Sequence, residues 1–385
     1  MTDDARAEPG PRRPPTVKDV ARVAGVSAST VSNVLHDRPY VTADKRARVQ
    51  AAIAQLGYRP SLAGRQLRAG RDGALALAVP DIQSPYFAEL AHVLMVQAHE
   101  RGITLFIDET TGDLARERTI AHGYRTRGIT GVIFCPVAIP LGELEAMKGD
   151  IPTVLLGEYV TGGAFDHIAI DSHASAVDVA EHLLAAGRRR FAFAGYLPPS
   201  GAGPAWSRLN GVRDALRRHG LALPERAVVR TPAHSREDGM RAAELLIAGK
   251  AHVDAFVGAA DLVSVGAIRA FKQAGVAIPE DVAVVGWDDS PEGRFTLPAL
   301  ASVAHPMERI AITAIDLIER RRSDPGLPPQ HTIVPYRTIW RESAGAGPRR
   351  SSGDDADDDV QGGGEDDGAE DVGQQAVAQR HRADR

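Results

Sequence analysis

The residues with the clearest potential for chemistry are the basic side chains near the start of the chain. Between Thr16 and Arg71, lysine and arginine outnumber aspartate and glutamate by ten to three, although the whole chain has a formal net charge of -5. The ten basic residues are Lys18, Arg22, Arg38, Lys45, Arg46, Arg48, Arg59, Arg65, Arg68 and Arg71. A local excess of this kind favours binding to a polyanion.

Residues arranged for catalysis or metal binding are much harder to find. The best candidates for acid–base chemistry are Asp288 and Asp289, but consecutive side chains at the end of a strand point to opposite sides. The histidines lack the spacing of zinc ligands, so we interpret them as surface or satisfied interior residues. They include His167, His173, His234 and His305. The single cysteine, Cys135, cannot form an intramolecular disulfide or a cysteine cluster. The sequence therefore predicts no enzyme, no cofactor and no metal.

Local signals predict two short helices at the start of the basic region. Thr16 and Asp19 have the spacing of a capping box, which begins a first helix. Gly25-Val26-Ser27 predicts a tight turn, and Ser27 is placed to cap a second helix from Ala28 to about Leu35. Two short helices joined in this way form a helix-turn-helix.

A third helix is predicted to complete a small all-α head. Thr42 is placed to cap it, and it is expected to run to about Leu56 and to end at Gly57. The expected core positions are Val20, Val23 and Ala24 in the first helix and Ala47, Ala51 and Leu56 in the third.

Beyond Arg71, apolar runs alternate with amphipathic segments, which is typical of parallel α/β units. Strands are expected at 74–79, 103–107, 131–135, 153–156, 190–194, 255–257 and 282–285, and helices at 86–100, 174–186, 208–219 and 263–273. The length of this region suits two α/β halves better than one compact domain.

The stretch TVKDVARVAGVSASTVSNVL at 16–35 closely resembles the head of the lactose-repressor family of bacterial regulators. RPSLAGRQL at 59–67 is similar to the hinge helix of that family, and SPYFAEL at 84–90, PEDVAVVGWDD at 279–289 and WRES at 340–343 resemble its sensor domain. The resemblance implies an α/β bilobal body of the periplasmic-binding-protein-like fold, with two doubly wound parallel sheets. The implied domains are an N-terminal arm (1–15), a helix-turn-helix DNA-binding domain (16–58), a hinge (59–72), an effector-binding and dimerisation domain (73–343) and an acidic tail (344–385).

In a module of this kind the second helix lies in the major groove of DNA. The resemblance therefore implies that Ala28, Ser29 and Asn33 face base edges, where Asn can bind adenine with two hydrogen bonds. Residues similar to family positions that hold phosphates are Thr16, Ser27, Thr30, Ser32 and Tyr58. Ser27 and Thr30 can serve as helix caps at the same time, and Tyr58 has the alternative role of a half-buried core aromatic.

The resemblance also assigns a role to the hinge. Leu67, followed by Arg68, resembles the leucine that wedges into the minor groove and kinks the duplex. The alternative is that Leu67 packs in a core. Ser61 and Gly64 depart from the usual Asn and Ala, and Gly lowers helix propensity by about 1 kcal/mol relative to Ala. A hinge that is unfolded away from DNA and folds reluctantly is expected.

A small effector, by family default a sugar, is expected between the two lobes. Tyr86 and Phe87 would form an apolar wall from one lobe. Arg208, Asp261 and Asp288 are the polar candidates from the other lobe, because such groups bind vicinal hydroxyls in paired hydrogen bonds.

Aromatic residues and family departures refine the expected effector site. Trp287 and Trp206 can lie against a sugar face, with packing as the alternative for both. Gly157 and Ala260 replace an Asp and an Asn of well-known members, and the loop at 200–204 lacks residues of the purine repressor. These departures disfavour a purine ligand.

The expected partners are double-stranded DNA, a small effector and a second copy of the chain. One head offers few base contacts, so a homodimer on a pseudo-palindromic operator is expected. The C-terminal region has no leucine heptads, which favours a dimer over a tetramer, and the Asp, Glu, Gly and Ser composition of 351–371 predicts disorder.

No apolar stretch approaches the roughly 20 residues that span a bilayer, and the N-terminus has no apolar signal core. A cytoplasmic location and no membrane association are therefore expected. Two alternatives remain: a periplasmic solute-binding protein, which would need an export signal and no DNA-binding head, and a DNA-binding regulator without ligand control.

Overall fold

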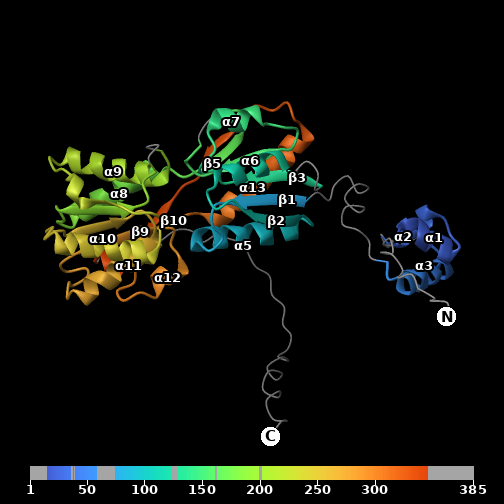
Figure 1. Ribbon diagram of the computed structural model, residues 1–385, viewed down its shortest axis with the longest axis horizontal. Coiled ribbons are helices and arrows are strands. Elements are labelled where there is room, and N and C mark those ends of the chain that lie inside the picture. Colours follow the sequence, from blue (N-terminus) through green and yellow to red (C-terminus); the bar gives the residue numbers. More distant parts are fainter. Residues whose placement is uncertain are drawn as a thin grey trace, which may run out of the picture. The chain divides into compact units, whose positions relative to one another are not determined.

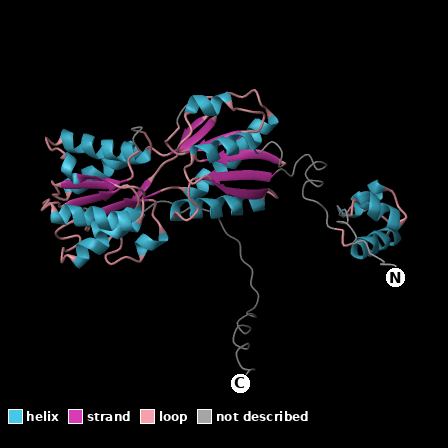
Figure 2. Ribbon diagram, in the orientation of Figure 1, coloured by secondary structure: helices cyan, strands magenta, loops and turns pink. Residues whose placement is uncertain are grey.

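The computed structural model describes residues 15–35, 38, 40–58, 74–123, 128–160, 163–198 and 202–345 (Figure 1). The hinge residues Leu67 and Arg68 and residues 346–385 of the acidic tail lie outside the described residues, so what the sequence predicts for them stays a prediction. The described chain forms a small helical head and two α/β lobes (Figure 2).

The head consists of α1 (Val17–Ala24), α2 (Ala28–Leu35) and α3 (Ala43–Leu56). The predicted capping box is present: the Asp19 amide donates to Thr16 Oγ1 over 3.4 Å, and the Thr16 amide donates to Asp19 Oδ2 over 2.9 Å. Gly25 and Gly57 end α1 and α3 in the left-handed conformation, with φ of 62° and 60°. Thr42 precedes α3 as predicted, but its side chain forms no capping hydrogen bond.

The core of the head differs in part from the predicted one. Val20 and Ala24 are buried, whereas Val23 is 38% exposed, and Ala47 and Ala51 are also exposed. The inward face of α3 is formed by Val49, Ala52, Ile53 and Leu56. This i, i+3, i+4, i+7 spacing is the apolar stripe that a packed helix buries, and it leaves the two predicted alanines on the outer side.

The N-lobe is built on a parallel sheet with the strand order β11-β5-β4-β3-β1-β2. Its strands are β1 (Ala74–Val79), β2 (Thr104–Glu109), β3 (Ile129–Phe134), β4 (Thr153–Leu156), β5 (Asp166–Ala169) and β11 (His331–Ile333). The helices that cover it are α5 (Pro85–Glu100), α6 (Leu114–Gly123), α7 (Leu141–Ala146) and α13 (Met307–Ser323). Along β1, the leucines and the alanines enter separate cores on the two faces of the sheet, which is why this strand is apolar throughout.

The C-lobe has a sheet with the strand order β12-β10-β9-β8-β6-β7, in which β12 alone runs antiparallel to its neighbour. Its strands are β6 (Phe191–Gly195), β7 (Val228–Arg230), β8 (Ala255–Gly258), β9 (Ala283–Trp287), β10 (Ala301–Ala304) and β12 (Arg337–Ile339). Its helices are α8 (Ser172–Ala185), α9 (Pro204–Arg218), α10 (Arg236–Ala248), α11 (Asp261–Gln273) and α12 (Pro291–Arg294), with short 3-10 turns at Glu225–Ala227 and Glu342–Ala344.

The chain passes between the lobes after β5, after β10 and after β11. The predicted fold class, an all-α head followed by a bilobal α/β body, is confirmed, and every predicted strand is present within two residues of its expected ends. Five short strands, β5, β7, β10, β11 and β12, were not predicted, because three or four residues give too little hydrophobic pattern to recognise. No described helix is long and apolar enough to cross a membrane.

Candidate functional site

The start of α2 presents linked hydroxyl groups. Ser27 Oγ accepts a hydrogen bond from the Thr30 amide over 3.2 Å, and it lies 2.8 Å from Ser29 Oγ and 2.9 Å from Thr30 Oγ1. The predicted capping role of Ser27 is therefore confirmed. Ala28 and Ser29 are exposed, and Asn33 is half-buried on the same helix.

Thr16 and Tyr58, like Ser27, are predicted phosphate-binding residues that also have structural roles. Thr16 is half-buried and is occupied by the capping box with Asp19. Hydrogen bonds from Thr16 and Arg22 lower the pKa of Asp19. Tyr58 packs in the head core and is only 9% exposed, which matches the core-aromatic alternative. A phosphate contact by Tyr58 would have to be made by the small exposed part of its side chain.

One basic residue of the head is used internally. Arg48 of α3 donates to the Ala24 carbonyl from Nε and Nη2, over 3.0 and 2.7 Å, and to the Gly25 carbonyl over 2.8 Å. A cation at the C-terminal end of α1 complements the helix dipole. Arg48 thus ties α3 to the turn of the helix-turn-helix, and its charge is not fully available to a polyanion.

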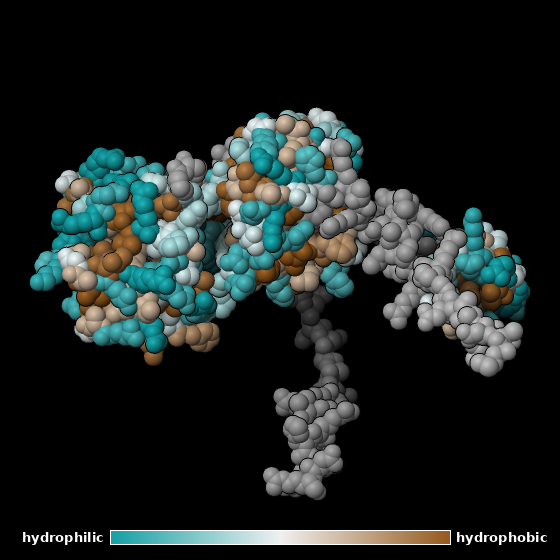
Figure 3. All heavy atoms as spheres, viewed as in Figure 1, coloured by the Kyte–Doolittle hydropathy of each residue, from teal (hydrophilic) through white to brown (hydrophobic). Residues whose placement is uncertain are grey.

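A cavity of about 580 Å³ lies between the two lobes. The sequence-predicted residues that line it are Tyr86, Phe87, Arg208 and Asp288. Tyr86 and Phe87 follow the first residue of α5, Arg208 lies in α9, and Asp288 directly follows β9. On the face shown in Figure 3, hydrophilic residues cover most of both lobes, with smaller hydrophobic areas between them.

The predicted apolar wall is a pair of perpendicular rings at the cavity. The centroids of Tyr86 and Phe87 are 4.9 Å apart with an interplanar angle of 80°. Burial, with further contributions from Cys135 and Asp288, raises the pKa of Tyr86, so its hydroxyl stays protonated. The wall can therefore offer an apolar face and one hydroxyl to a ligand.

Arg208 is held firmly by its own lobe. Its Nη1 donates to the Ala259 carbonyl over 2.5 Å, and its Nε donates to Ser172 Oγ over 3.3 Å. Its guanidinium carbon lies 5.2 Å from the ring centroid of Trp287, which supports the group from behind. The side chain is oriented before any ligand arrives, and among the described residues its Nη2 has no hydrogen-bond partner.

Comparison with known proteins places the chain in a family. Residues 16–61 match the family model described as bacterial regulatory proteins, lacI family, and residues 180–344 match a periplasmic binding protein-like domain. The ribose operon repressor of Escherichia coli K12 is 30% identical over 331 residues, which cover 86% of this chain and 99% of that protein. The chain belongs to the lacI family of bacterial regulatory proteins.

Solved structures agree with this family assignment. A lacI-family transcriptional regulator from Sanguibacter keddieii is 33% identical, with a TM-score of 0.65 over 72% of this chain and 100% of that one. The lac repressor dimer bound to operator and an anti-inducer is 22% identical, with a TM-score of 0.75 over 87% of this chain and 100% of that one, and supports the fold. Membership in a family of regulatory proteins agrees with the expectation that the chain is not an enzyme.

Two of the predicted effector residues do not line the cavity of this lacI-family chain. Asp261 is 1% exposed, and its carboxylate accepts hydrogen bonds from the Ser290 amide and from Ser302 Oγ, over 2.7 and 2.6 Å. Trp287 is fully buried and donates to Ser175 Oγ over 3.2 Å. The prediction of direct ligand contact is corrected for both, because each side chain enters the interior of the C-lobe. For Trp287 the packing alternative is the correct one.

Trp206 also has internal partners. Its Nε1 donates to the Pro198 carbonyl over 2.8 Å, and the Arg230 guanidinium lies 5.1 Å from its ring. It is not among the residues that line the cavity. Packing is therefore the role that its environment supports.

Asp288 and Asp289 diverge as the sequence predicts. Asp288 lines the cavity, whereas Asp289 forms salt bridges with Arg294 and Arg341 on the opposite side, over 3.0 and 2.5 Å. The two carboxylates cannot act together on one ligand group. Among the described residues, no group of three acidic, histidine or cysteine side chains is arranged to hold a metal ion.

Several residues of the cavity were not predicted from the sequence. They include Glu158, Tyr159, Tyr196, His234 and His305. The interpretation of the histidines as surface or satisfied residues is wrong for His305, whose Nε2 is buried and has no hydrogen-bond partner among the described residues. For His234, burial and Arg208 lower the pKa to about 4, so this ring is neutral near pH 7. The one sequence signal for these five residues is that each follows a strand, where the cleft is expected.

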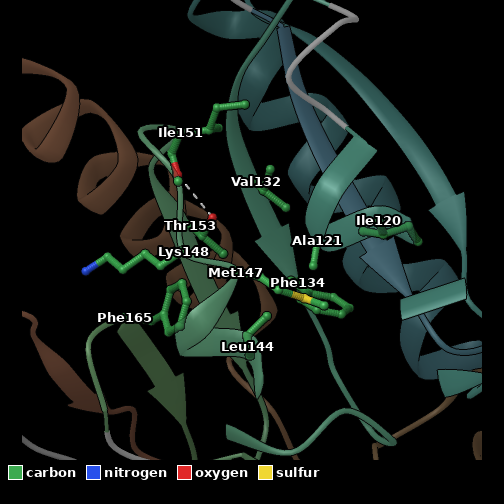
Figure 4. A pocket seen from close by; sticks show the side chains of 11 residues that line it. Ile120, Ala121, Val132, Phe134, Leu144, Met147, Lys148, Ile151, Thr153 and Phe165 are labelled. Atoms are coloured by element: carbon green, nitrogen blue, oxygen red, sulfur yellow. Dashed lines mark hydrogen bonds between the residues drawn. The ribbon is translucent and has the colours of Figure 1, made fainter. Parts of the chain in front are cut away.

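A second cavity, of about 40 Å³, lies within the N-lobe (Figure 4). Its walls are mostly apolar side chains from α6, β3, α7 and the segment after α7, with Phe134 and Phe165 among them. Lys148 lies at this cavity, 5.4 Å from the Phe165 centroid, and donates to the Ala164 carbonyl. No sequence-predicted site residue lies here, and the volume is far below that of a typical ligand pocket.

Proposed function

We propose that this chain is a transcriptional repressor that binds a pseudo-palindromic operator as a homodimer and changes its operator affinity when a sugar binds between its lobes. The observation that carries the proposal is the 580 Å³ interlobe cavity, lined by an aromatic wall and oriented polar groups, in a chain that also carries a helix-turn-helix head. The relatedness to a ribose operon repressor supports a sugar as the effector. A bacterial repressor must reach the DNA, which lies in the cytoplasm, so we place this chain there.

Roles in DNA binding follow from the exposed start of α2. We assign base reading to Ala28, Ser29 and Asn33 because they lie on the helix that enters the major groove in such modules. Phosphate contacts are assigned to Thr16, Ser27, Thr30 and Ser32. Minor-groove insertion is assigned to Leu67, with Arg68 beside it. Replacing Leu67 with Ala should then reduce operator bending and affinity together.

Roles in effector binding follow from the cavity. Tyr86 and Phe87 would lie against the apolar face of a sugar ring, and Arg208 and Asp288 would bind its hydroxyls. Because these residues come from both lobes, a bound sugar favours one angle between the lobes. In a dimer this angle sets the spacing of the two hinges and therefore the affinity for DNA.

The test is fluorescence anisotropy of the full chain on DNA from upstream of its own gene, against random DNA, with D-ribose and a panel of other neutral sugars. Tight, salt-sensitive binding to the specific fragment that one sugar changes would support the proposal. The variant Phe87→Ala should keep its DNA affinity and lose the response to that sugar.

The two alternatives predict different results. A regulator without ligand control would bind the operator equally tightly with every sugar, and a solute-binding protein would bind a sugar but no DNA. Either outcome would contradict the proposal.

A further inference from the structure

His305 is a buried polar group whose environment does not satisfy it. It follows β10 at one of the passages between the lobes, and its side chain is only 6% exposed. Its Nε2 is buried and forms no hydrogen bond with any described residue, although His305 is one of the residues that line the interlobe cavity. A buried polar atom without a hydrogen bond lowers the stability of the folded protein, and such atoms are rare.

The carboxylate of Asp288 lies close to His305. The Nε2 atom and Asp288 Oδ1 are 3.4 Å apart, but their geometry does not make a hydrogen bond. His305 also contacts the ring of Tyr86 from the N-lobe, with centroids 4.9 Å apart and an interplanar angle of 65°. The imidazole ring therefore has Asp288 and Tyr86 as its close neighbours.

The backbone of Asp288 is unusual as well. It has a φ of 107°, a conformation that residues other than glycine rarely adopt, and its amide donates to the Val303 carbonyl of β10 over 2.9 Å. Strained backbone of this kind persists where the surrounding structure fixes it, commonly at ligand sites. In this conformation the Asp288 carboxylate lies beside His305 and forms no hydrogen bond with its Nε2.

One kind of ligand group complements both atoms at once. A hydroxyl can accept a hydrogen bond from a protonated Nε2 while it donates its own hydrogen to the carboxylate. We propose that His305 and Asp288 hold a single hydroxyl of the effector between them, and that His305 determines which arrangement of hydroxyls the cavity accepts. This inference rests on the proposed function and assigns to His305 a role in effector specificity.

We expect substitution of His305 to weaken sugar binding without lowering the stability of the protein. Replacing His305 with Leu removes the unpaired nitrogen, so the variant should unfold at the same temperature as the parent or a higher one. It should nevertheless bind the sugar on the order of tenfold more weakly, because the hydroxyl loses its donor. A purely structural histidine would show the reverse, with lower stability and unchanged affinity.

The experiment is isothermal titration calorimetry on the full chain with D-ribose, D-xylose, L-arabinose, D-glucose, D-galactose and cellobiose. For a sugar that binds, its singly deoxygenated analogues are titrated into the parent protein, His305→Leu and His305→Gln. One deoxy analogue should lose affinity with the parent protein but show little further loss with His305→Leu, which makes the two losses non-additive. His305→Gln, which keeps an amide donor, should recover part of the affinity. His173→Leu, at a histidine bonded to Asp214 on the C-lobe surface, is the control and should bind like the parent.

Three results would overturn the inference. The first is that no neutral sugar in the panel binds a chain that still binds its operator, which would leave the DNA-binding part of the proposed function intact. The second is that His305→Leu binds the sugar as tightly as the parent. The third is that the losses from His305→Leu and from every deoxy analogue simply add.

Discussion

The ring of Tyr159 in the N-lobe lies directly on Gly203 in the C-lobe. A Cβ atom at Gly203 would stand 2.3 Å from Tyr159 Cε1, and Gly203 has a φ of 98° in front of α9. Burial raises the pKa of Tyr159 to about 12, so its hydroxyl stays protonated. The lobes thus touch at the edge of the cavity, at a position where an added Cβ would clash with the Tyr159 ring.

This contact predicts that Gly203→Ala lowers the stability of the protein and increases the distance between its lobes. The substitution introduces backbone strain of roughly 1–3 kcal/mol and, in addition, forces the ring of Tyr159 away. Gly187→Ala is a matched control, because Gly187 has a φ of 90° but no atom within 4 Å of its added Cβ. We expect thermal unfolding to show a larger loss for Gly203→Ala than for Gly187→Ala, and pulsed spin-label measurements to show a longer distance between the lobes.

The double variant Gly203→Ala, Tyr159→Ala tests the cause. With the ring removed, the distance between the lobes should no longer depend on the residue at 203. If Gly203→Ala and Gly187→Ala lose the same stability, backbone strain alone explains the loss and the Tyr159 contact contributes nothing.

Asn33→Ala is expected to weaken binding to the true operator by about 1–3 kcal/mol and to leave binding to random DNA nearly unchanged, because it removes a base contact and no phosphate contact. Anisotropy titrations on both DNAs measure the difference. The same loss on both would refute a base-reading role for Asn33.

Arg48→Gln should act through the structure of the head. It removes hydrogen bonds from a partly exposed side chain to the end of α1, which should cost roughly 1 kcal/mol of head stability. DNA affinity should fall, but the slope of log affinity against log salt should stay the same. Lys18→Gln is the comparison: if this exposed lysine meets a phosphate, its loss should lower the slope by about 1. A reduced slope for Arg48→Gln would mean that Arg48 contacts phosphate instead.

The raised pKa of Asp261 predicts that the stability of the protein depends on pH. Burial, with the nearby charge of Asp288, raises the pKa of Asp261 to about 8, whereas its ordinary value is 3.8. Between these two values the folded state binds the proton more tightly than the unfolded state, so the free energy of unfolding falls as the pH rises from about 4 to about 8. Asp261→Asn mimics the protonated form and should lack this contribution.

Denaturant unfolding of both proteins between pH 5 and pH 8.5 checks this expectation. The advantage of Asp261→Asn over the parent should grow as the pH rises. A constant difference across the range would show that Asp261 does not titrate in the folded protein.

The sequence alone determined the head and much of the cleft. The capping box, the turn at Gly25 and the start of α2 depend on residues a few positions apart, so local rules suffice to predict them. The longer parallel strands carry apolar runs that identify them. Tyr86 and Asp288 were pointed to by the segments at 84–90 and 279–289 that resemble the family's sensor domain. Family resemblance supplied the roles that these local signals could not.

Which polar groups reach the cavity depends on how distant segments of the chain pack together. Asp261 turns into the C-lobe because Gly286, which is distant in sequence, leaves room for its carboxylate: a Cβ there would lie 2.3 Å from Asp261 Oδ1. Among the described residues His305 Nε2 has no hydrogen-bond partner, although Asp288 from the C-lobe and Tyr86 from the N-lobe both lie close to it. Such properties depend on contacts between segments far apart in the chain, and no local pattern of residue types encodes them.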